Sequence, residues 1–206
     1  YEVYEKLNEI EKSLKTVCAL WKSGEYDRIV FTGMGSSYFI SQAAATLLSA
    51  DSIPAFAVNA GELLHFQHPA LTSRTLLVAI SQSGESYEVI ELLKKQSYLQ
   101  LTIIGITNEA ESSLARMATC PLLCKAGKED MTSTKTFVTT YLVIYLLAQA
   151  LKGNEVSEEV LNKVVKEVER QLAEQETYLS HSLSFLSTVC ISNPTHFRIL
   201  SLPVWH

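Results

Sequence analysis

A turn of six residues, Ser81-Gln-Ser-Gly-Glu-Ser86, places three hydroxyl groups, a carboxamide and a glycine between two runs of different character. The preceding run, Thr75–Ile80, is apolar and predicts a buried strand, and the following run, 87–95, is amphipathic and predicts a helix. Free backbone N–H groups and the positive end of the helix dipole meet at such a junction, which suits an anion. We therefore predict a phosphate site. Its predicted ligands are the three serine hydroxyls of the turn, those of Ser81, Ser83 and Ser86, with Gly84 beside them.

A plain helix cap is the alternative interpretation of this turn. Serine is a good N-cap residue, and Glu85 or Glu88 would complement the dipole of the following helix. One capping serine needs no ligand, but three hydroxyls and a glycine within six residues exceed what capping requires. A serine nucleophile is not predicted, because the Gly-x-Ser-x-Gly elbow is absent.

A second hydroxyl-rich turn, Gly33-Met-Gly-Ser-Ser37, follows the β-rich segment 28–32. Small hydroxyl residues at a helix start suit a sugar hydroxyl or a phosphate, so Ser36 and Ser37 are candidate ligand contacts, with a purely structural turn as the alternative. A dinucleotide fingerprint would need a third glycine where Tyr38 stands and an acidic residue where Asn59 stands. We therefore predict no NAD or FAD, and no cofactor.

Two further segments offer candidates with equally plain alternatives. Ser133 and Lys135 lie in a Thr- and Ser-rich segment before a long apolar run, where they either contact a ligand or belong to a helix cap. Glu62 follows the second predicted strand and is a weak candidate for a general base, but a carboxylate in the first turn of a helix is also favoured by the dipole. The imidazoles of His65 and His68 have no evident third partner, so we predict no metal site.

Strand and helix patterns alternate along the first three quarters of the chain. The predicted strands are short and apolar, as in a parallel sheet covered on both faces. They span residues 28–32, 55–59, 75–80, 101–106 and 119–124, and the predicted helices span residues 3–21, 36–50, 61–67, from 86, 112–117 and 134–151. The pattern predicts a three-layer α/β/α sandwich with a five-stranded parallel sheet, of the flavodoxin- or Rossmann-like kind. Ligands of such sheets bind at the carboxyl ends of the strands, where both serine turns lie.

The composition limits the domain count and the partners. The chain has 206 residues, of which 47% are hydrophobic, and a net charge of −5. This length suits one domain or one domain with part of another. The acidic balance argues against a nucleic-acid partner. The apolar run 137–151 is shorter than the roughly 20 residues of a membrane span, so we predict a buried helix and no membrane partner.

The cysteines indicate a reducing compartment. Cys120 and Cys124 stand four residues apart in a predicted strand, so both sulfurs lie on one face of it. Buried free thiols are the preferred interpretation over metal ligands or a disulfide, and they fit a cytoplasmic location.

Three regions are predicted along the chain. Residues 1–24 form an N-terminal amphipathic helix and residues 25–153 the binding domain. Residues 154–206 form a helical connector, with a helix at about 157–180 and a strand at 196–200, and the start of a possible truncated second domain.

The motifs together resemble those of the SIS (sugar isomerase) family. They fall in order and at suitable spacing, at residues 33–37, 79–86, 126–129 and 133–137. They are most similar to the first SIS domain in the isomerase half of glucosamine-6-phosphate synthase and to related phosphosugar isomerases and deglycases. By this resemblance, Ser81, Gln82, Ser83 and Ser86 bind the phosphate, Ser36 and Ser37 contact the sugar or its phosphate, and Ser133 binds a sugar hydroxyl.

The resemblance implies a cytoplasmic homodimer that binds a sugar phosphate. The expected activity is ketose–aldose isomerisation, or an amino-sugar deaminase or deglycase reaction, on a hexose 6-phosphate. A non-catalytic module that senses a phosphosugar is the alternative. The catalytic residues of the synthase lie in its second SIS domain, so they are expected to be missing from this chain, and Met34 stands where the synthase has cysteine.

Overall fold

The computed structural model describes residues 7–95, 97–127, 135–154, 166 and 170. The chain divides into two compact units, residues 1–155 and 156–206, and the fold described below is that of the first. The predicted connector helix at 157–180 and the predicted strand at 196–200 lie outside the described residues, apart from two isolated positions.

Five parallel strands form one sheet in the order β2-β1-β3-β4-β5. This arrangement confirms the predicted parallel sheet. The central strand β3 is buried along its whole length, since its side chains are covered on both faces. The strand bounds are β1 Arg28–Gly33, β2 Ala55–Asn59, β3 Thr75–Ile80, β4 Thr102–Thr107 and β5 Cys120–Leu123.

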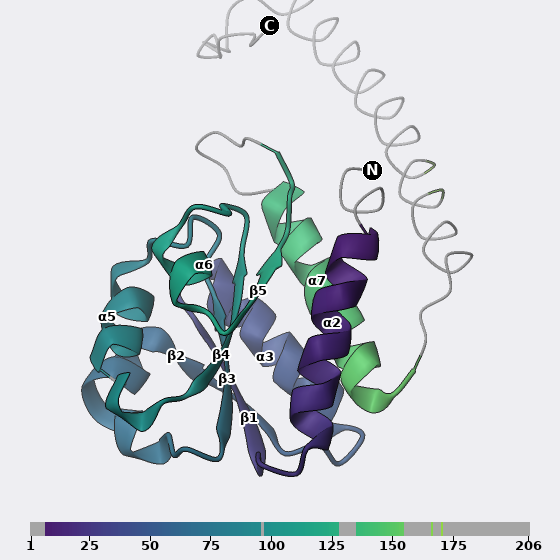
Figure 1. Ribbon diagram of the computed structural model, residues 1–206. Coiled ribbons are helices and arrows are strands. Elements are labelled where there is room, and N and C mark those ends of the chain that lie inside the picture. Colours follow the sequence, from purple (N-terminus) through teal and green to yellow (C-terminus); the bar gives the residue numbers. More distant parts are fainter. Residues whose placement is uncertain (1–6, 96, 128–134, 155–165, 167–169, 171–206) are drawn as a thin grey trace, which may run out of the picture. The chain divides into compact units, whose positions relative to one another are not determined.

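Helices cover both faces of this sheet (Figure 1). The helices α2, α3 and α7 pack together on one face, and α4, α5 and α6 with the short turns between them pack on the other. The first group spans Leu7–Lys22, Ser36–Ser49 and Lys135–Lys152. The second group spans α4 Ala60–Glu62, the π-helix η1 Leu63–Gln67, the 3₁₀ turns η2 His68–Ala70 and η3 Ser97–Leu99, α5 Tyr87–Lys95 and α6 Ser113–Met117. The three-layer α/β/α fold is therefore confirmed.

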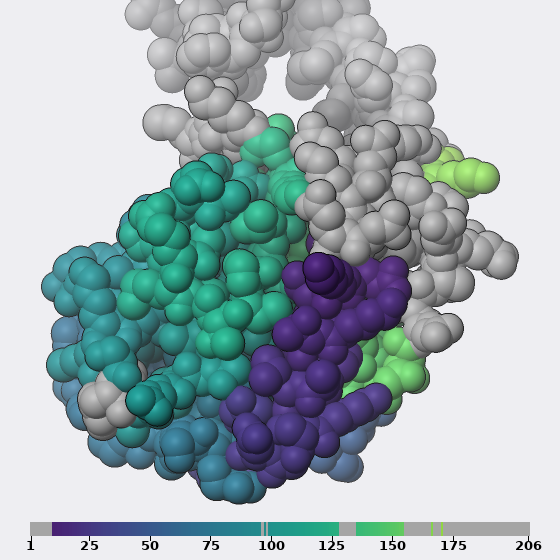
Figure 2. Space-filling model, viewed as in Figure 1, coloured from purple at the N-terminus to yellow at the C-terminus, as the bar shows by residue number. Residues whose placement is uncertain are grey.

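The N-terminal helix α2 is part of the same compact unit as the sheet. It packs against β5 and α7, and the space-filling view shows α2 (purple) directly beside α7 (green) (Figure 2). The Cys120 thiol donates to the carbonyl oxygen of Ser13 in α2 at 3.7 Å, and the sulfur of Cys124 lies 3.4 Å from Thr140 Oγ1 in α7. Both sulfurs therefore lie on the face covered by α2 and α7.

Successive side chains along each strand point to opposite faces of the sheet, so they fill the core on both sides of it. Val30, Leu77 and Ala79 point to the face of α4 and α5, where they join Leu64 and Leu92 in one hydrophobic cluster. Ile29 and Phe31 alternate with Val30 along β1 and therefore point to the opposite face. Helices pack on both faces of the sheet, and this packing fixes the positions of the strand ends from which the turns begin.

The register brings the carboxyl ends of the strands into line. Gly33 at the end of β1 pairs with Ile80 at the end of β3 and with Asn59 at the end of β2. The chain leaves β1 toward β2 on one side and later returns to β3 on the other, so the order reverses between β1 and β3. Such a switch point, beyond the carboxyl ends of the strands, is where open α/β sheets bind ligands.

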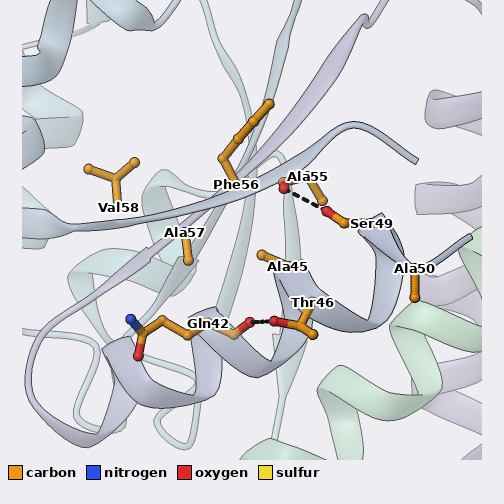
Figure 3. Close-up of a pocket in the computed structure, with 9 residues that line it drawn as sticks. All are labelled: Gln42, Ala45, Thr46, Ser49, Ala50, Ala55, Phe56, Ala57 and Val58. Carbon is orange, nitrogen blue, oxygen red and sulfur yellow. Dashed lines mark hydrogen bonds between the residues drawn. The ribbon is translucent and has the colours of Figure 1, made fainter. Parts of the chain in front are cut away.

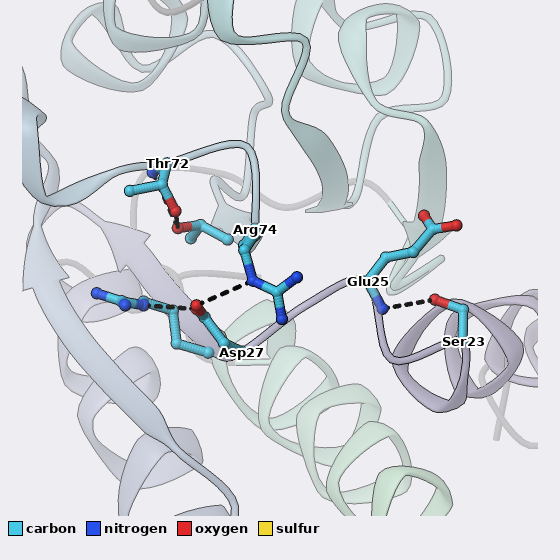
Figure 4. A network of polar contacts seen from close by, with 7 residues as sticks. Ser23, Glu25, Asp27, Thr72 and Arg74 are labelled. Atoms are coloured by element: carbon cyan, nitrogen blue, oxygen red, sulfur yellow. Dashed lines mark hydrogen bonds and ion pairs between the residues drawn. The ribbon is translucent and has the colours of Figure 1, made fainter.

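The opposite, amino edge of the sheet carries a polar network (Figure 4). Asp27 accepts hydrogen bonds from Arg28 Nε at 2.8 Å and from Arg74 Nε at 3.2 Å. The pair of guanidinium groups, Arg28 first, lowers the pKa of the Asp27 carboxyl. This network joins the segments that lead into β1 and β3 and lies at the end of the sheet away from the serine turns.

The structure differs from the expected helix at 61–67. Helix α4 begins one residue earlier, because the side chain of Asn59 accepts the Gly61 amide at 2.9 Å and caps it. After three residues the helix widens into the π-helix η1, and Pro69 then lies in a 3₁₀ turn.

Candidate functional site

The phosphate turn predicted at 81–86 connects β3 to α5. Its first four residues form a β-turn, in which the Gly84 amide donates to the Ser81 carbonyl at 3.1 Å. Gly84 has a φ of +65°, and a Cβ there would lie 2.1 Å from Ser112 Oγ, so only glycine fits this position. The tight turn places Gln82 and Ser83 at the outer tip of the connection.

The hydroxyl of Ser81 is directed inward. Only 1% of this residue is exposed, and its Oγ lies 2.9 Å from Ser86 Oγ and accepts the Ser86 amide at 3.4 Å. The Ser86 carbonyl accepts from the Ile90 amide at 3.0 Å, so Ser86 is the N-cap residue that directly precedes α5. Ser81 thus fixes the start of the helix, while its role as a direct phosphate ligand stays a prediction.

The outer part of the turn presents hydrogen-bond donors that are not used. In the described part of the chain, the amides of Gln82 and Ser83 have no hydrogen-bond partner. Ser83 is exposed, and its hydroxyl accepts the Glu85 amide at 3.2 Å, which leaves the hydroxyl proton to donate elsewhere. Two amides and a hydroxyl in the turn that precedes α5 are neutral donors of the kind that can bind an anion near a helix N-terminus.

Glu85 caps a different helix from the one expected. The sequence favoured Glu85 or Glu88 as a partner of the α5 dipole, but Glu85 Oε1 accepts the Ser113 amide at 2.6 Å, at the start of α6. This hydrogen bond is the main cause of the lowered pKa of Glu85, with Arg116 contributing. Ser112 caps the same helix by accepting the Ala115 amide at 3.3 Å. The phosphate turn is therefore attached to α6.

The second predicted turn lies next to the first. A Cβ on Gly33 would lie 2.9 Å from the Ile80 carbonyl oxygen and 2.9 Å from Ser37 Cβ, so the missing side chain lets the start of α3 approach the end of β3. Gly35 is the N-cap of α3 with a φ of +52°, and no side chain caps this helix. Ser36 and Ser37 thus stand at the uncapped end of a second helix beside the phosphate turn.

The remaining candidates lie on other elements or outside the described ranges. Glu62 is exposed at the end of α4, which follows β2 and packs against α5. Ser133 lies outside the described residues, while Lys135 begins α7. His65 is exposed and His68 half-buried. No group of three or more His, Cys, Asp or Glu side chains that could hold a metal occurs in the ranges that the structure describes.

Two residues that were not among the predicted site residues, Thr107 and Asn108, contact the turn at 81–86 directly. Thr107 Oγ1 and the Asn108 amide donate to the Gln82 carbonyl at 3.2 and 3.0 Å. The Asn108 side chain also binds the third loop, since its Oδ1 accepts the Ala126 amide at 2.7 Å and its Nδ2 donates to the Gly127 carbonyl at 3.0 Å. Their position at the carboxyl end of a buried strand, with Thr107 its last residue and Asn108 the next, was the signal that could have found them.

A separate pocket lies along the free edge of β2 (Figure 3). Its volume is about 760 Å³, and it lies between β2 and α3. The lining residues are Gln42, Ala45, Thr46, Ser49, Ala50, Ala55, Phe56, Ala57 and Val58. None of the predicted site residues lines this pocket, so the serine turns are a different part of the surface.

Fold and site together define a class of protein. A five-stranded parallel sheet with helices on both faces is what the SIS resemblance implied, and the structure has it, with hydroxyl-rich turns after β1 and β3. The SIS domain family matches residues 25–150. The chain belongs to the SIS domain family. None of the helices in the described ranges combines the length and hydropathy that crossing a bilayer requires.

Several characterised proteins are similar to this chain. The glutamine–fructose-6-phosphate aminotransferase (isomerizing) of Pyrococcus horikoshii is 35% identical over 129 residues, which cover 62% of this chain and 22% of the relative. The arabinose 5-phosphate isomerase KdsD of Francisella tularensis is 33% identical over 157 residues, which cover 73% of this chain and 48% of the relative. The chain therefore spans about a fifth to a half of the length of these relatives.

A solved structure of a phosphosugar deaminase is also similar to this chain. The glucosamine-6-phosphate deaminase of Thermotoga maritima superposes with a TM-score of 0.60 at 29% identity, over 80% of this chain and 51% of that one. The chain is thus homologous to phosphosugar isomerases and to a phosphosugar deaminase.

Proposed function

We propose that residues 25–153 bind a sugar phosphate, with the phosphate at the tip of the 81–86 turn and the sugar toward Ser36 and Ser37. The observation that carries this proposal is the pair of unpartnered amides, those of Gln82 and Ser83, in the turn that precedes α5 and at the switch point of the sheet. Homology to proteins named for fructose 6-phosphate, arabinose 5-phosphate and glucosamine 6-phosphate supports the ligand class.

The proposed role of the bound sugar phosphate is that of a substrate. The reaction would be ketose–aldose isomerisation, or a related deaminase or deglycase reaction, on a hexose 6-phosphate. Both transfer a proton between adjacent carbons of the open-chain sugar, and a fixed phosphate would hold those carbons in place for a general base. Glu62 remains a weak candidate for that base, and the assignment of Ser133 to a sugar hydroxyl remains part of the proposal.

A non-catalytic sensor is the second candidate function. A module of this kind would use the same turn at 81–86 to hold a phosphosugar and would leave it unchanged. Saturable binding with no isomerase, deaminase or deglycase turnover would support the sensor. Turnover of any hexose 6-phosphate by the chain alone would exclude it.

Calorimetry tests the binding proposal. We expect fructose 6-phosphate and glucosamine 6-phosphate to bind, and fructose without its phosphate to bind much more weakly. Arabinose 5-phosphate tests whether the site tolerates a shorter sugar. An absence of binding for every phosphorylated sugar at millimolar concentration would contradict the proposal.

We also propose that the protein is a homodimer in the cytoplasm. Helix α3 contains no charged residue, and α7 is charged only at its two terminal lysines. The exposed side chains of these helices combine polar residues with four large hydrophobic ones, Phe39, Phe137, Val138 and Tyr141, and Phe39 and Val138 are each 64% exposed. A surface with so little charge can face its own copy across a two-fold axis without repulsion between like charges. The free thiols Cys18, Cys120 and Cys124 suit a reducing compartment.

A further inference from the structure

The orientation of one peptide group decides whether the phosphate turn offers its best donor. Gln82 and Ser83 are the two central residues of the β-turn closed by Gly84. In a trans peptide the C=O and the following N–H point in opposite directions, so the Gln82 carbonyl and the Ser83 amide are oriented together. Type I and type II turns differ by a flip of this central peptide. A flip would turn the Ser83 N–H away from its present direction.

The end of β4 holds this peptide in one orientation. The Gln82 carbonyl accepts two hydrogen bonds, from Thr107 Oγ1 at 3.2 Å and from the Asn108 amide at 3.0 Å. Because β3 lies between β4 and β1, a carbonyl directed at β4 directs the Ser83 amide toward β1 and the turn that carries Ser36 and Ser37. That is the side on which the uncapped start of α3 lies.

Thr107 is fixed well enough to perform this task. It is 1% exposed at the last position of β4, and its Oγ1 also accepts the Glu109 amide at 3.2 Å. With the Glu109 N–H donating to the oxygen, the hydroxyl proton is left to donate to the Gln82 carbonyl. The hydroxyl therefore has a defined direction, and no other side chain of the described residues donates to that carbonyl.

We propose that Thr107 is a positioning residue for the anion site. By donating to the Gln82 carbonyl, Thr107 keeps the Ser83 amide directed at the bound phosphate. Thr107 does not touch the ligand. It keeps the Ser83 amide oriented before the ligand binds, so that binding does not have to turn the peptide. This inference rests on the proposed function, because it assigns Thr107 a role in the same phosphate site.

The test compares four proteins by calorimetry with fructose 6-phosphate and with inorganic phosphate. These are the wild type, Thr107→Val, Thr107→Ser and Thr75→Val. Valine keeps the shape of threonine and removes the hydroxyl, while serine restores the hydroxyl. Thr75 is the matched control, since it is 0% exposed and its Oγ1 accepts the Thr72 amide at 3.1 Å, but it begins β3 at the amino edge of the sheet.

We expect Thr107→Val to weaken the binding of both anions by roughly three- to tenfold, as for the loss of one well-placed hydrogen bond. Thr107→Ser and Thr75→Val should bind within about twofold of the wild type, on the same scale. If Thr107→Val does not fold, Thr107→Cys replaces it with the same expectation, because a thiol is only a weak donor. Equal affinities of the wild type and the Thr107 variant would overturn the inference.

A second measurement separates positioning from a general loss of stability. Backbone ¹⁵N relaxation of the ligand-free proteins should show a more mobile Ser83 amide in Thr107→Val and an unchanged one in Thr75→Val. A Ser83 amide as rigid in Thr107→Val as in the wild type would overturn the inference. A wild-type protein that binds neither anion would instead overturn the proposed function, and with it the role assigned to Thr107.

Discussion

Glu85 Oε1 accepts a 2.6 Å hydrogen bond from the backbone amide of Ser113, which joins the phosphate turn to the start of α6. Glu85 and Ser113 are 28 residues apart and belong to connections that follow different strands. The carboxylate therefore serves as an N-terminal cap for α6, the helix that follows β4. The turn that carries the candidate phosphate ligands depends in this way on the position of α6.

The Glu85 cap predicts a pH-dependent contribution to stability. Its folded-state pKa lies below the ordinary 4.5, chiefly because of the Ser113 amide. A carboxyl with a lowered folded pKa contributes stability that is present above its unfolded pKa and is lost as the pH falls through the folded pKa. Glu85→Gln should therefore be less stable than the wild type at pH 7, and this difference should shrink at pH values below about 4.5.

Urea denaturation at pH 7 and pH 3 measures this difference. Glu111→Gln serves as the control, since it removes a negative charge from an exposed position near the same helix without removing the Glu85 cap. A stability difference for Glu85→Gln that is equal at the two pH values would contradict the ionised cap.

Gly84 is expected to tolerate no side chain. Gly84→Ala would place a methyl group 2.1 Å from Ser112 Oγ at a φ of +65°, so strain and overpacking should together lower the free energy of unfolding. We expect a loss of roughly 2–4 kcal/mol, measured by urea denaturation. Gly24→Ala, at a φ of +77° with no atom within 4 Å, should lose only about 1 kcal/mol from backbone strain. Similar losses for the two variants would argue against the close packing on Ser112.

Substitution of Ser81 should mainly lower stability, whereas substitution of Ser83 should mainly weaken ligand binding. Ser81 is buried and holds Ser86 at the helix start, so Ser81→Ala should lower the free energy of unfolding by roughly 1–2 kcal/mol. Ser83 is exposed, so Ser83→Ala should keep nearly the wild-type stability and weaken the binding of a sugar phosphate by about tenfold. Calorimetry and thermal unfolding of the same preparations measure both quantities. Wild-type affinity in Ser83→Ala would remove this hydroxyl from the site.

The cysteines should differ in their reactivity. Burial is the main cause that raises the pKa of Cys124, to about 11, so at pH 8 it is a protonated thiol that a reagent cannot reach. Burial also raises the pKa of Cys18, but that side chain is only half-buried. In a Cys190→Ser background, peptide mapping after iodoacetamide treatment should find Cys18 labelled first and Cys124 only after unfolding. Early labelling of Cys124 would contradict its burial against Thr140.

The proposed dimer can be tested on the uncharged surface of α3 and α7. These two helices pack against each other, and an ion pair joins Lys152 at the end of α7 to Asp51, just beyond the end of α3. Val138→Arg would introduce a charge into this surface and should convert a dimer to a monomer in analytical ultracentrifugation. Phe66→Arg is the control, because Phe66 is 73% exposed but lies on the opposite helical layer. A monomeric wild type, or a Val138→Arg dimer, would exclude this interface.

Much of the fold could be predicted because its signals are local. The apolar runs at 55–59 and 75–80 are bounded by breaks in the pattern and match β2 and β3 to the residue. Gly153, with a φ of +80°, follows the end of α7 as its position after a long apolar run predicts. Element ends were less certain, since β4 begins and ends one residue later than its apolar run, at Thr102 and Thr107.

The sequence by itself also determined where the candidate site lies, because parallel strands in an alternating pattern place the turns at 33–37 and 81–86 at one edge. Only the tertiary structure decided what each polar group in those turns does. The inward hydroxyl of Ser81, the Glu85 cap on α6 and the hold of Thr107 on the Gln82 carbonyl depend on strand order and on contacts between separate loops. Hydrophobic periodicity is a local property of the chain, whereas a hydrogen bond between two loops exists only once the sheet has brought them together.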